Sequence, residues 1–115
     1  MRSAAAIFDH HLEVFAAGDL EGILSDYAPD AVMIHGAQAW HGIDGARRFF
    51  TRWLDELLPA GCRFDLIDRT VTDDMVFISW RAESARYRFD FGTDTFVMRD
   101  DRIWRQTVAT VEQRK

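Results

Sequence analysis

Residues 15–36, FAAGDLEGILSDYAPDAVMIHG, decide the fold that we predict for this chain. Gly18 ends a first helix, because glycine adopts the left-handed conformation that follows a helix without steric cost. Asp19 begins a short second helix by accepting hydrogen bonds from its unpaired amides, and Pro29 stops that helix. The strand Ala31–His35 follows directly. This tight corner therefore brings an imidazole to the end of a strand.

The segment before this corner has the period of a helix. Ser3 is a suitable N-cap, and we expect the helix to run to about Ala17. Its apolar stripe consists of Ile7, Phe8, His11, Leu12, Phe15 and Ala16. His11 lies within the stripe and should point inward, whereas His10 lies about 100° round the helix and should face water. His11 is then either a core histidine bonded to a carbonyl or a working residue.

The chain after His35 predicts a third helix and four long strands. Asp44 should cap the helix, Pro59-Ala60-Gly61 should end it, and its apolar positions are Ala46, Phe49, Phe50, Trp53, Leu54, Leu57 and Leu58. The period then changes to that of strands, which we expect at 63–71, 75–84, 87–99 with a bulge or bend at Gly92, and 102–111. Only residues 112–115 should be frayed. We predict one α+β domain over residues 1–115, with the helices on the concave face of a curved sheet.

Composition narrows the class of protein. The 115 residues are 48% hydrophobic and include one cysteine, Cys62, so we expect a packed core without an internal disulfide. Fourteen basic and nineteen acidic residues give a net charge of −5, which argues against binding to nucleic acid or an anionic membrane. The apolar runs are too short to cross a bilayer, and the N-terminus lacks a signal-peptide layout. We therefore expect a soluble cytoplasmic protein.

A curved sheet closed by helices should enclose an apolar cavity, which is the usual place for a ligand. Strand alternation places Asp94 on the same face as Phe96 and Met98. If Asp94 is buried, it should stay neutral through a raised pKa or pair with a cation. Alternatively it lies in water near a hairpin tip, or Gly92 shifts the register. The predicted pocket consists of Phe15, Met33, Phe50, Trp53, Phe96, Met98, Trp104, Gln106 and Val108.

The pattern resembles the nuclear transport factor 2-like superfamily, and in particular its SnoaL-like and ketosteroid-isomerase-like branch. The residues that carry the resemblance are the Gly18-Asp19 link, the segment from Tyr27-Ala28 to Ala31, the run His41–Ala46 and the hairpin Asp94–Ile103. The resemblance implies a cone in which three N-terminal helices pack on a strongly curved, mostly antiparallel sheet around a pocket. It also implies a small hydrophobic ligand and no cofactor.

The resemblance further implies roles for three residues. His11 falls where ketosteroid isomerases carry a donor tyrosine, His35 where they carry the carboxylate base, and Asp94 where they carry a protonated aspartic acid. The two histidines depart from that pattern, and Phe50 cannot hydrogen-bond where those enzymes often have a tyrosine. We therefore do not expect a steroid isomerase with intact machinery. Polyketide cyclases and dehydratases of the superfamily use pocket histidine and aspartate for proton transfer.

These observations lead to a hypothesis of an isomerase or lyase that moves a proton beside a carbonyl. His35 would be the base, and Asp94 and His11 would donate hydrogen bonds or orient the base. The same three groups satisfy the ligand count of a mononuclear metal site, although no short ligand motif supports one and we predict no metal. The alternative is a ligand-binding or accessory module without turnover. Apolar residues on the outer face of the strands predict a symmetric homodimer.

Overall fold

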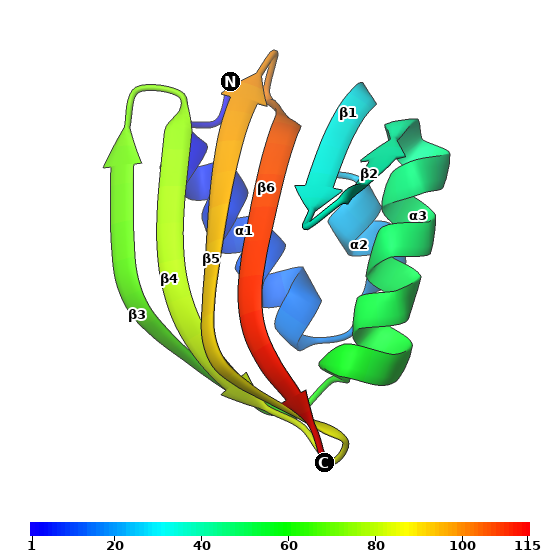
Figure 1. Ribbon diagram of the computed structural model, residues 1–115. Coiled ribbons are helices and arrows are strands. Elements are labelled where there is room, and N and C mark those ends of the chain that lie inside the picture. The colour runs from blue at the N-terminus through cyan, green and yellow to red at the C-terminus, as the bar shows by residue number, and fades with distance from the viewer.

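Six strands form one curved sheet in the order β2-β1-β6-β5-β4-β3, and the helices pack on its concave side (Figure 1). The computed structural model describes residues 1–115. The helices are α1 (Ala4–Ala16), α2 (Leu20–Leu24) and α3 (Gly42–Arg52), which continues into a π-helical turn, η1 (Trp53–Leu57). The strands are β1 (Tyr27–His35), β2 (Gln38–His41), β3 (Arg63–Thr72), β4 (Met75–Glu83), β5 (Tyr87–Arg99) and β6 (Arg102–Arg114).

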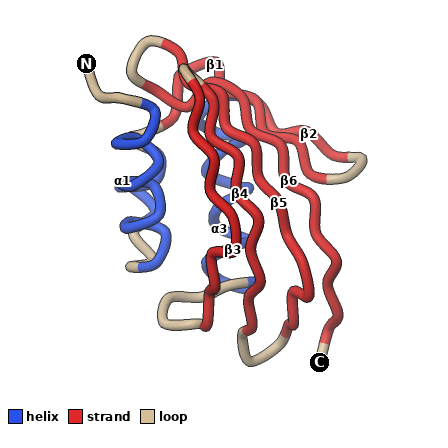
Figure 2. The backbone as a smooth tube through the Cα atoms, turned by 90° about the vertical axis from the view of Figure 1, so that its left-hand side faces the viewer, coloured by secondary structure: helices blue, strands red, loops and turns tan.

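The sheet is antiparallel except where β1 runs parallel to β6. The long strands bend, and α1 lies behind them while α3 stands beside β1 and β2 (Figures 1 and 2). The sheet does not close into a barrel. This architecture confirms the predicted α+β class and the predicted cone of helices on a curved, mostly antiparallel sheet.

The corner between the first two helices is capped as predicted. The Ser3 hydroxyl accepts a hydrogen bond from the Ala6 amide at 3.1 Å, and the Asp19 carboxylate accepts one from the Gly22 amide at 2.9 Å. Gly18 has a φ of +70°, the left-handed conformation expected after a helix. The role predicted for Pro29 is wrong, because α2 already ends at Leu24 and Pro29 lies within β1.

Proline fits this strand because the pairing of β1 with β6 is interrupted there. The register shifts between Tyr27 and Val32, so the missing amide of Pro29 interrupts no regular ladder. The strand consequently begins at Tyr27, four residues before the start predicted from the sequence. This longer strand carries the Tyr27 side chain into the core.

The third helix and the chain end also differ from the prediction. A short, largely exposed strand, β2, was not predicted, and α3 begins at Gly42 without a side-chain cap rather than at Asp44. The predicted fraying of residues 112–115 is wrong for 112–114, because β6 continues to Arg114 and pairs with the start of β5. The apolar face of the third helix is confirmed, with Phe49, Phe50 and Trp53 buried.

Gly92 allows close contact between β5 and a tryptophan of β4. A Cβ atom at Gly92 would lie 2.4 Å from ring atoms of Trp80, so only glycine fits beneath the indole. The pairing of β5 with β6 shifts just before it, between Phe89 and Phe91. Beyond this irregularity the strand keeps Asp94 on the inner face. The alternative in which Asp94 lies in water is therefore wrong.

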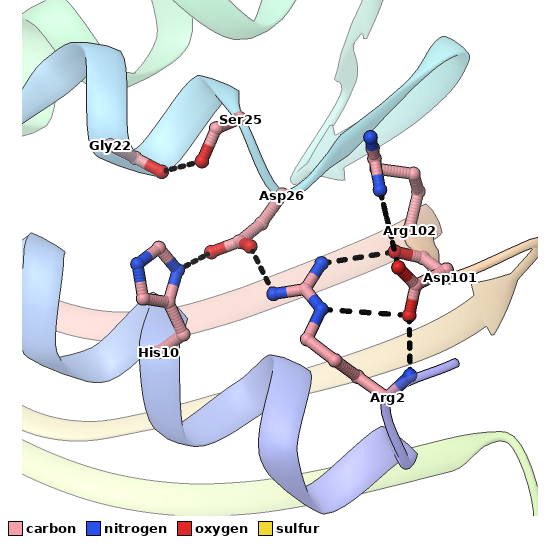
Figure 3. A network of polar contacts seen from close by, with 7 residues as sticks. All are labelled: Arg2, His10, Gly22, Ser25, Asp26, Asp101 and Arg102. Carbon is pink, nitrogen blue, oxygen red and sulfur yellow. Dashed lines mark hydrogen bonds and ion pairs between the residues drawn. The ribbon is translucent and has the colours of Figure 1, made fainter.

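A buried carboxylate fastens the start of the chain to the sheet (Figure 3). Asp26, at the α2–β1 corner, is 1% exposed and accepts hydrogen bonds from Arg2 Nη1 at 2.8 Å and from His10 Nδ1 at 2.6 Å. Arg2 also contacts Asp101 in the β5–β6 turn through its amide and its guanidinium. The His10 side chain is 40% exposed, so it meets water as predicted, but it also bonds the buried Asp26. This network holds α1, and with it His11, against the sheet.

Candidate functional site

A small apolar cavity lies between α1, the α3–η1 helix and strands β4, β5 and β6. Its volume is about 50 Å³, and twelve of its fifteen lining residues are hydrophobic. Of the predicted pocket residues, six line it: Phe15, Phe50, Trp53, Phe96, Gln106 and Val108. Two of the three predicted catalytic residues, His11 and Asp94, line it as well. The helices and the sheet therefore bring one imidazole and one carboxyl group to a single cavity.

Asp94 is buried on β5 and is held by donors from both neighbouring strands. Its Oδ1 accepts a hydrogen bond from Trp80 Nε1 at 2.8 Å, and its Oδ2 accepts one from Gln106 Nε2 at 2.9 Å. Gln106 Oε1 in turn accepts a hydrogen bond from the Tyr27 hydroxyl. Because an indole N–H can only donate, Oδ1 of Asp94 must accept. The arrangement suits a carboxylate better than a carboxylic acid.

The pKa values agree with this bonding pattern. Burial raises the pKa of Asp94 to about 6, against the opposing effect of the Trp80 and Gln106 hydrogen bonds. Burial, and then the negative charge of Asp94, raises the pKa of Tyr27, so this phenol keeps its proton and donates it to Gln106. Near neutral pH Asp94 is therefore mostly ionised. The raised pKa expected for a buried Asp94 is confirmed, whereas the alternative of a cation partner is not, because neutral donors bond the carboxyl group.

His11 is buried on α1 without a partner for its Nδ1 atom. Its ring packs edge-on against Tyr27, Phe50 and Phe96, with centroid distances of 5.8, 5.7 and 5.3 Å. Burial lowers the pKa of His11 to about 4, so the imidazole is neutral at physiological pH. Buried polar atoms without a partner are rare in folded proteins, so the unpaired Nδ1 marks His11 as unusual for a core residue. This geometry does not match a core histidine held through Nδ1 by a carbonyl.

His35 lies outside this cavity, although it ends β1 as predicted. Its Nε2 is 3.0 Å from Thr110 Oγ1, and its ring stacks on Trp53 at a centroid distance of 5.7 Å. Trp53 itself lines the cavity, whereas His35 does not. Burial lowers the pKa of His35. Of the three predicted catalytic residues, His35 is therefore the one that does not line the cavity.

Three predicted pocket residues also lie elsewhere. Met33 and Met98 are buried in the core but do not line the cavity. The Trp104 ring contacts the guanidinium groups of Arg99 and Arg105, which lie 4.9 and 3.8 Å from its centroid. The register shifts between Val97 and Met98, so alternation counted along β6 fails at Trp104.

The sequence hypothesis missed Trp80 and Tyr27 as members of the polar chain around Asp94. Strand alternation over residues 75–84 groups Trp80 with Val76, Ile78 and Ala82 on one face, and this was the available signal for its contact with Asp94. Tyr27 was assigned to the second helix, so its inward direction could not be seen. No three His, Cys, Asp or Glu side chains lie close enough together to hold a metal ion.

The sequence of this chain matches the family model of the SnoaL-like domain over residues 8–106, which is most of its length. The chain belongs to the SnoaL-like domain family. This result confirms the predicted SnoaL-like branch of the nuclear transport factor 2-like superfamily. No functionally curated protein matches the sequence significantly. None of the helices has the length and hydrophobicity needed to span a membrane.

Solved structures share the fold of this SnoaL-like chain at low sequence identity. A protein from Sinorhizobium meliloti with the provisional name polyketide cyclase is 17% identical, with a TM-score of 0.73 over 90% of this chain and 93% of that one. A protein from Kribbella flavida provisionally named ketosteroid isomerase is 13% identical, with a TM-score of 0.79 over 97% and 80%. An NTF2-like protein of unknown function from Mesorhizobium loti is 22% identical, with a TM-score of 0.77 over 94% and 90%.

The substitution Asp94→Asn should change how stability depends on pH. The pKa of Asp94 is about 6 in the folded chain and near 3.8 without burial, so the folded protein binds this proton more tightly. Protonation therefore stabilises the fold at low pH, and this contribution is lost as the pH rises through about 6. Relative to Asp94→Asn, the free energy of unfolding of the unaltered protein should fall by roughly 2 kcal/mol between about pH 4.5 and about pH 7.5.

Urea unfolding of both proteins across this pH range measures the difference. The titration of His11 and of the surface groups is common to both proteins and largely cancels. A difference that stays constant, or that grows with pH in favour of the unaltered protein, would show that Asp94 has no raised pKa.

Proposed function

We propose that this SnoaL-like protein binds a small, uncharged carbonyl compound in its inner cavity and transfers a proton at the carbon beside the carbonyl. The observation that carries the proposal is an ionisable carboxylate and an unpartnered neutral imidazole lining one apolar cavity. Both groups are buried, so neither is simply a solvated surface residue. No cofactor takes part in the proposed step.

Asp94, rather than His35, is the base in this proposal. Each oxygen of Asp94 accepts one hydrogen bond from the protein, which leaves lone pairs that can take a proton from a ligand. A pKa of about 6 places the carboxylate close to the pH at which a general base is most effective. Trp80 and Gln106 hold the carboxylate in place from both sides.

His11 donates its N–H to the carbonyl oxygen of the ligand. As the base removes the proton, the C–H electron pair forms the carbon–carbon double bond and the carbonyl π electrons move to oxygen. A neutral N–H donor in a low-dielectric site stabilises that developing negative charge. The low pKa of His11, about 4, keeps the ring neutral throughout. His11 is therefore the group that stabilises the enolate in this proposal.

The fate of the proton sets the reaction class. If the ligand has a C=C bond next to that carbon, a dienolate forms, and return of the proton from Asp94 to its far carbon shifts the double bond and gives an isomer, with Asp94 again a carboxylate. If a hydroxyl on the neighbouring carbon leaves instead, it takes the proton from Asp94 and departs as water. Both reactions balance without an oxidant or a metal, which is compatible with an isomerase or a lyase.

We also propose that two copies of this chain pair through the convex face of the sheet. Phe77, Thr95, Thr107 and Ile34 lie opposite one another across β4, β5, β6 and β1, and Phe91 lies opposite Val111. The four apolar members of this patch, Ile34, Phe77, Phe91 and Val111, are between 39% and 57% exposed. An uncharged patch of this kind can face an identical copy without like charges meeting.

The proposed reaction can be tested without knowing the natural ligand. The protein should accelerate exchange of the protons beside the carbonyl of butanone with solvent deuterium, followed by proton NMR. Asp94→Asn should lower the rate by about a hundredfold to ten-thousandfold, and His11→Leu by about a hundredfold or more. The rate should rise with pH and level off above about 6, where Asp94 is ionised.

His35→Gln distinguishes the two candidate bases in the same assay. It should leave the exchange rate close to that of the unaltered protein, because His35 does not line the cavity. Loss of exchange in His35→Gln with retention in Asp94→Asn would return the role of base to His35. If the unaltered protein folds and binds ligand but exchanges protons no faster than Asp94→Asn does, the result would favour a binding module without turnover.

Light scattering of the purified protein tests the pairing of sheets. The expected mass is that of a dimer, and Phe77→Asp should yield a monomer because it buries a charge at the centre of the patch. Val71→Asp is the matched control, since Val71 is 40% exposed but lies opposite the buried Val76 on the other face of the sheet. A monomeric mass for the unaltered protein contradicts the pairing.

A further inference from the structure

We infer that a second cavity, beside the first, binds an apolar tail of the same ligand. This outer cavity has a volume of about 130 Å³ and lies between the end of α1 and the segment that joins η1 to β3. Leu12, Phe15, Leu58 and Phe64 line both cavities and form the wall between them. The inference rests on the proposed function for the carbonyl end of the ligand.

The size of the inner cavity requires such an extension. A volume of about 50 Å³ holds only a few water molecules or a carbonyl group with its nearest carbons. Any larger ligand whose carbonyl reaches His11 and Asp94 must extend beyond the inner cavity. The shared wall leads to more than twice that volume.

The wall is one side chain thick and touches the polar groups of the inner cavity. The Phe15 ring lies 6.2 Å from the His11 ring, and the Phe64 ring stacks on Trp80 at 5.3 Å, measured between centroids. Trp80 is the residue that donates to Asp94. A ligand that passes between these side chains therefore places its carbonyl near His11 and Asp94 and its tail in the outer cavity.

The lining of the outer cavity selects the chemistry of the tail. Its remaining members are Ala16, Pro59, Gly61 and Cys62, so no charged side chain lines it. An alkyl or aryl tail loses water on entering such a site without leaving a polar group unpaired. A phosphate, carboxylate or ammonium in the tail would be buried without a partner. The ligand class is thus an uncharged ketone or aldehyde with an apolar tail.

The π-helical turn η1 places one residue in the inner cavity and the next residue after the turn in the wall between the two cavities. The Leu58 amide donates to the Trp53 carbonyl at 2.7 Å, a bond that spans five residues. This extra residue in the turn keeps both Trp53 and Leu58 buried, the first in the inner cavity and the second in the shared wall. Beyond Leu58 the chain leaves the helix and forms the rim of the outer cavity.

Cys62 provides a reporter of the outer cavity. It is the single cysteine of the chain and is partly buried in the lining. Burial raises the pKa of the Cys62 thiol, so modification is best followed under mildly alkaline conditions. A tail that fills the outer cavity should shield this thiol from a disulfide reagent. A ligand confined to the inner cavity should not.

The experiment uses a series of methyl ketones from acetone and butanone to hexanone and nonanone. NMR shifts of the His11 ring report the inner cavity, and the rate of Cys62 modification reports the outer one. Acetone and butanone should shift His11 without protecting Cys62, whereas the longer ketones should do both. Affinity should rise about fourfold for each methylene that enters the outer cavity and then level off.

Ala16→Trp and its neighbour Ala17→Trp form a matched pair. Both residues are exposed, but only Ala16 lines the outer cavity. Ala16→Trp should abolish the gain from chain length and leave the binding of acetone and butanone unchanged. Ala17→Trp should bind the whole series as the unaltered protein does.

The outcomes separate this inference from the proposed function. If long ketones shift His11 but neither protect Cys62 nor respond to Ala16→Trp, the tail site is wrong and the proposed function stands. If long ketones protect Cys62 without shifting His11, the two cavities do not hold one ligand and the inference is overturned. If no ketone shifts His11 or protects Cys62, both proposals fail.

Discussion

A buried carboxylate needs hydrogen-bond donors at the place where its strand puts it, and in this protein three strands meet that need together. Asp94 comes from β5, Trp80 from β4 and Gln106 from β6, and Tyr27 of β1 completes the chain by donating to Gln106. Ionised carboxylates are rarely buried without such partners. Gly92 contributes by leaving room for the Trp80 indole, whose N–H reaches Asp94. The curvature of the sheet, the bulge in β5 and the packing of the aromatic core therefore all help to position Asp94 and its hydrogen-bond donors.

The position of His11 depends on a second buried carboxylate, which bonds His10, the residue next to it on α1. Asp26 binds Arg2 and His10, and Arg2 reaches Asp101 in the β5–β6 turn. His10 thus faces a polar partner while its neighbour His11 faces the cavity. His10 anchors one face of α1 through its bond to Asp26. The adjacent face carries His11, whose Nδ1 has no hydrogen-bond partner in the protein. Buried charges are tolerated when they are paired in this way, and removal of a partner is usually destabilising.

Local patterns in the sequence predicted much of the fold, because helix caps, apolar periodicity and strand alternation act over a few residues. The caps at Ser3 and Asp19 and the apolar face of the third helix were found in this way. Features that depend on distant partners were not. Pro29 lies in a strand because β6 pairs irregularly there, and Trp104 leaves the pocket because of a register shift. For the same reason the inward positions of His11 and Asp94 could be predicted, whereas the stacking of His35 on Trp53 could not.

The central claim is that Asp94 is a carboxylate of raised pKa, held by neutral donors beside a neutral imidazole. A carbon-13 NMR titration of the aspartate carboxyl groups, with Asp94 assigned by comparison with Asp94→Asn, tests it most directly. The account predicts that the Asp94 signal titrates with a pKa of about 6 and that His11 stays neutral until about pH 4. An Asp94 signal that titrates near 3.8, the value without burial, would contradict it.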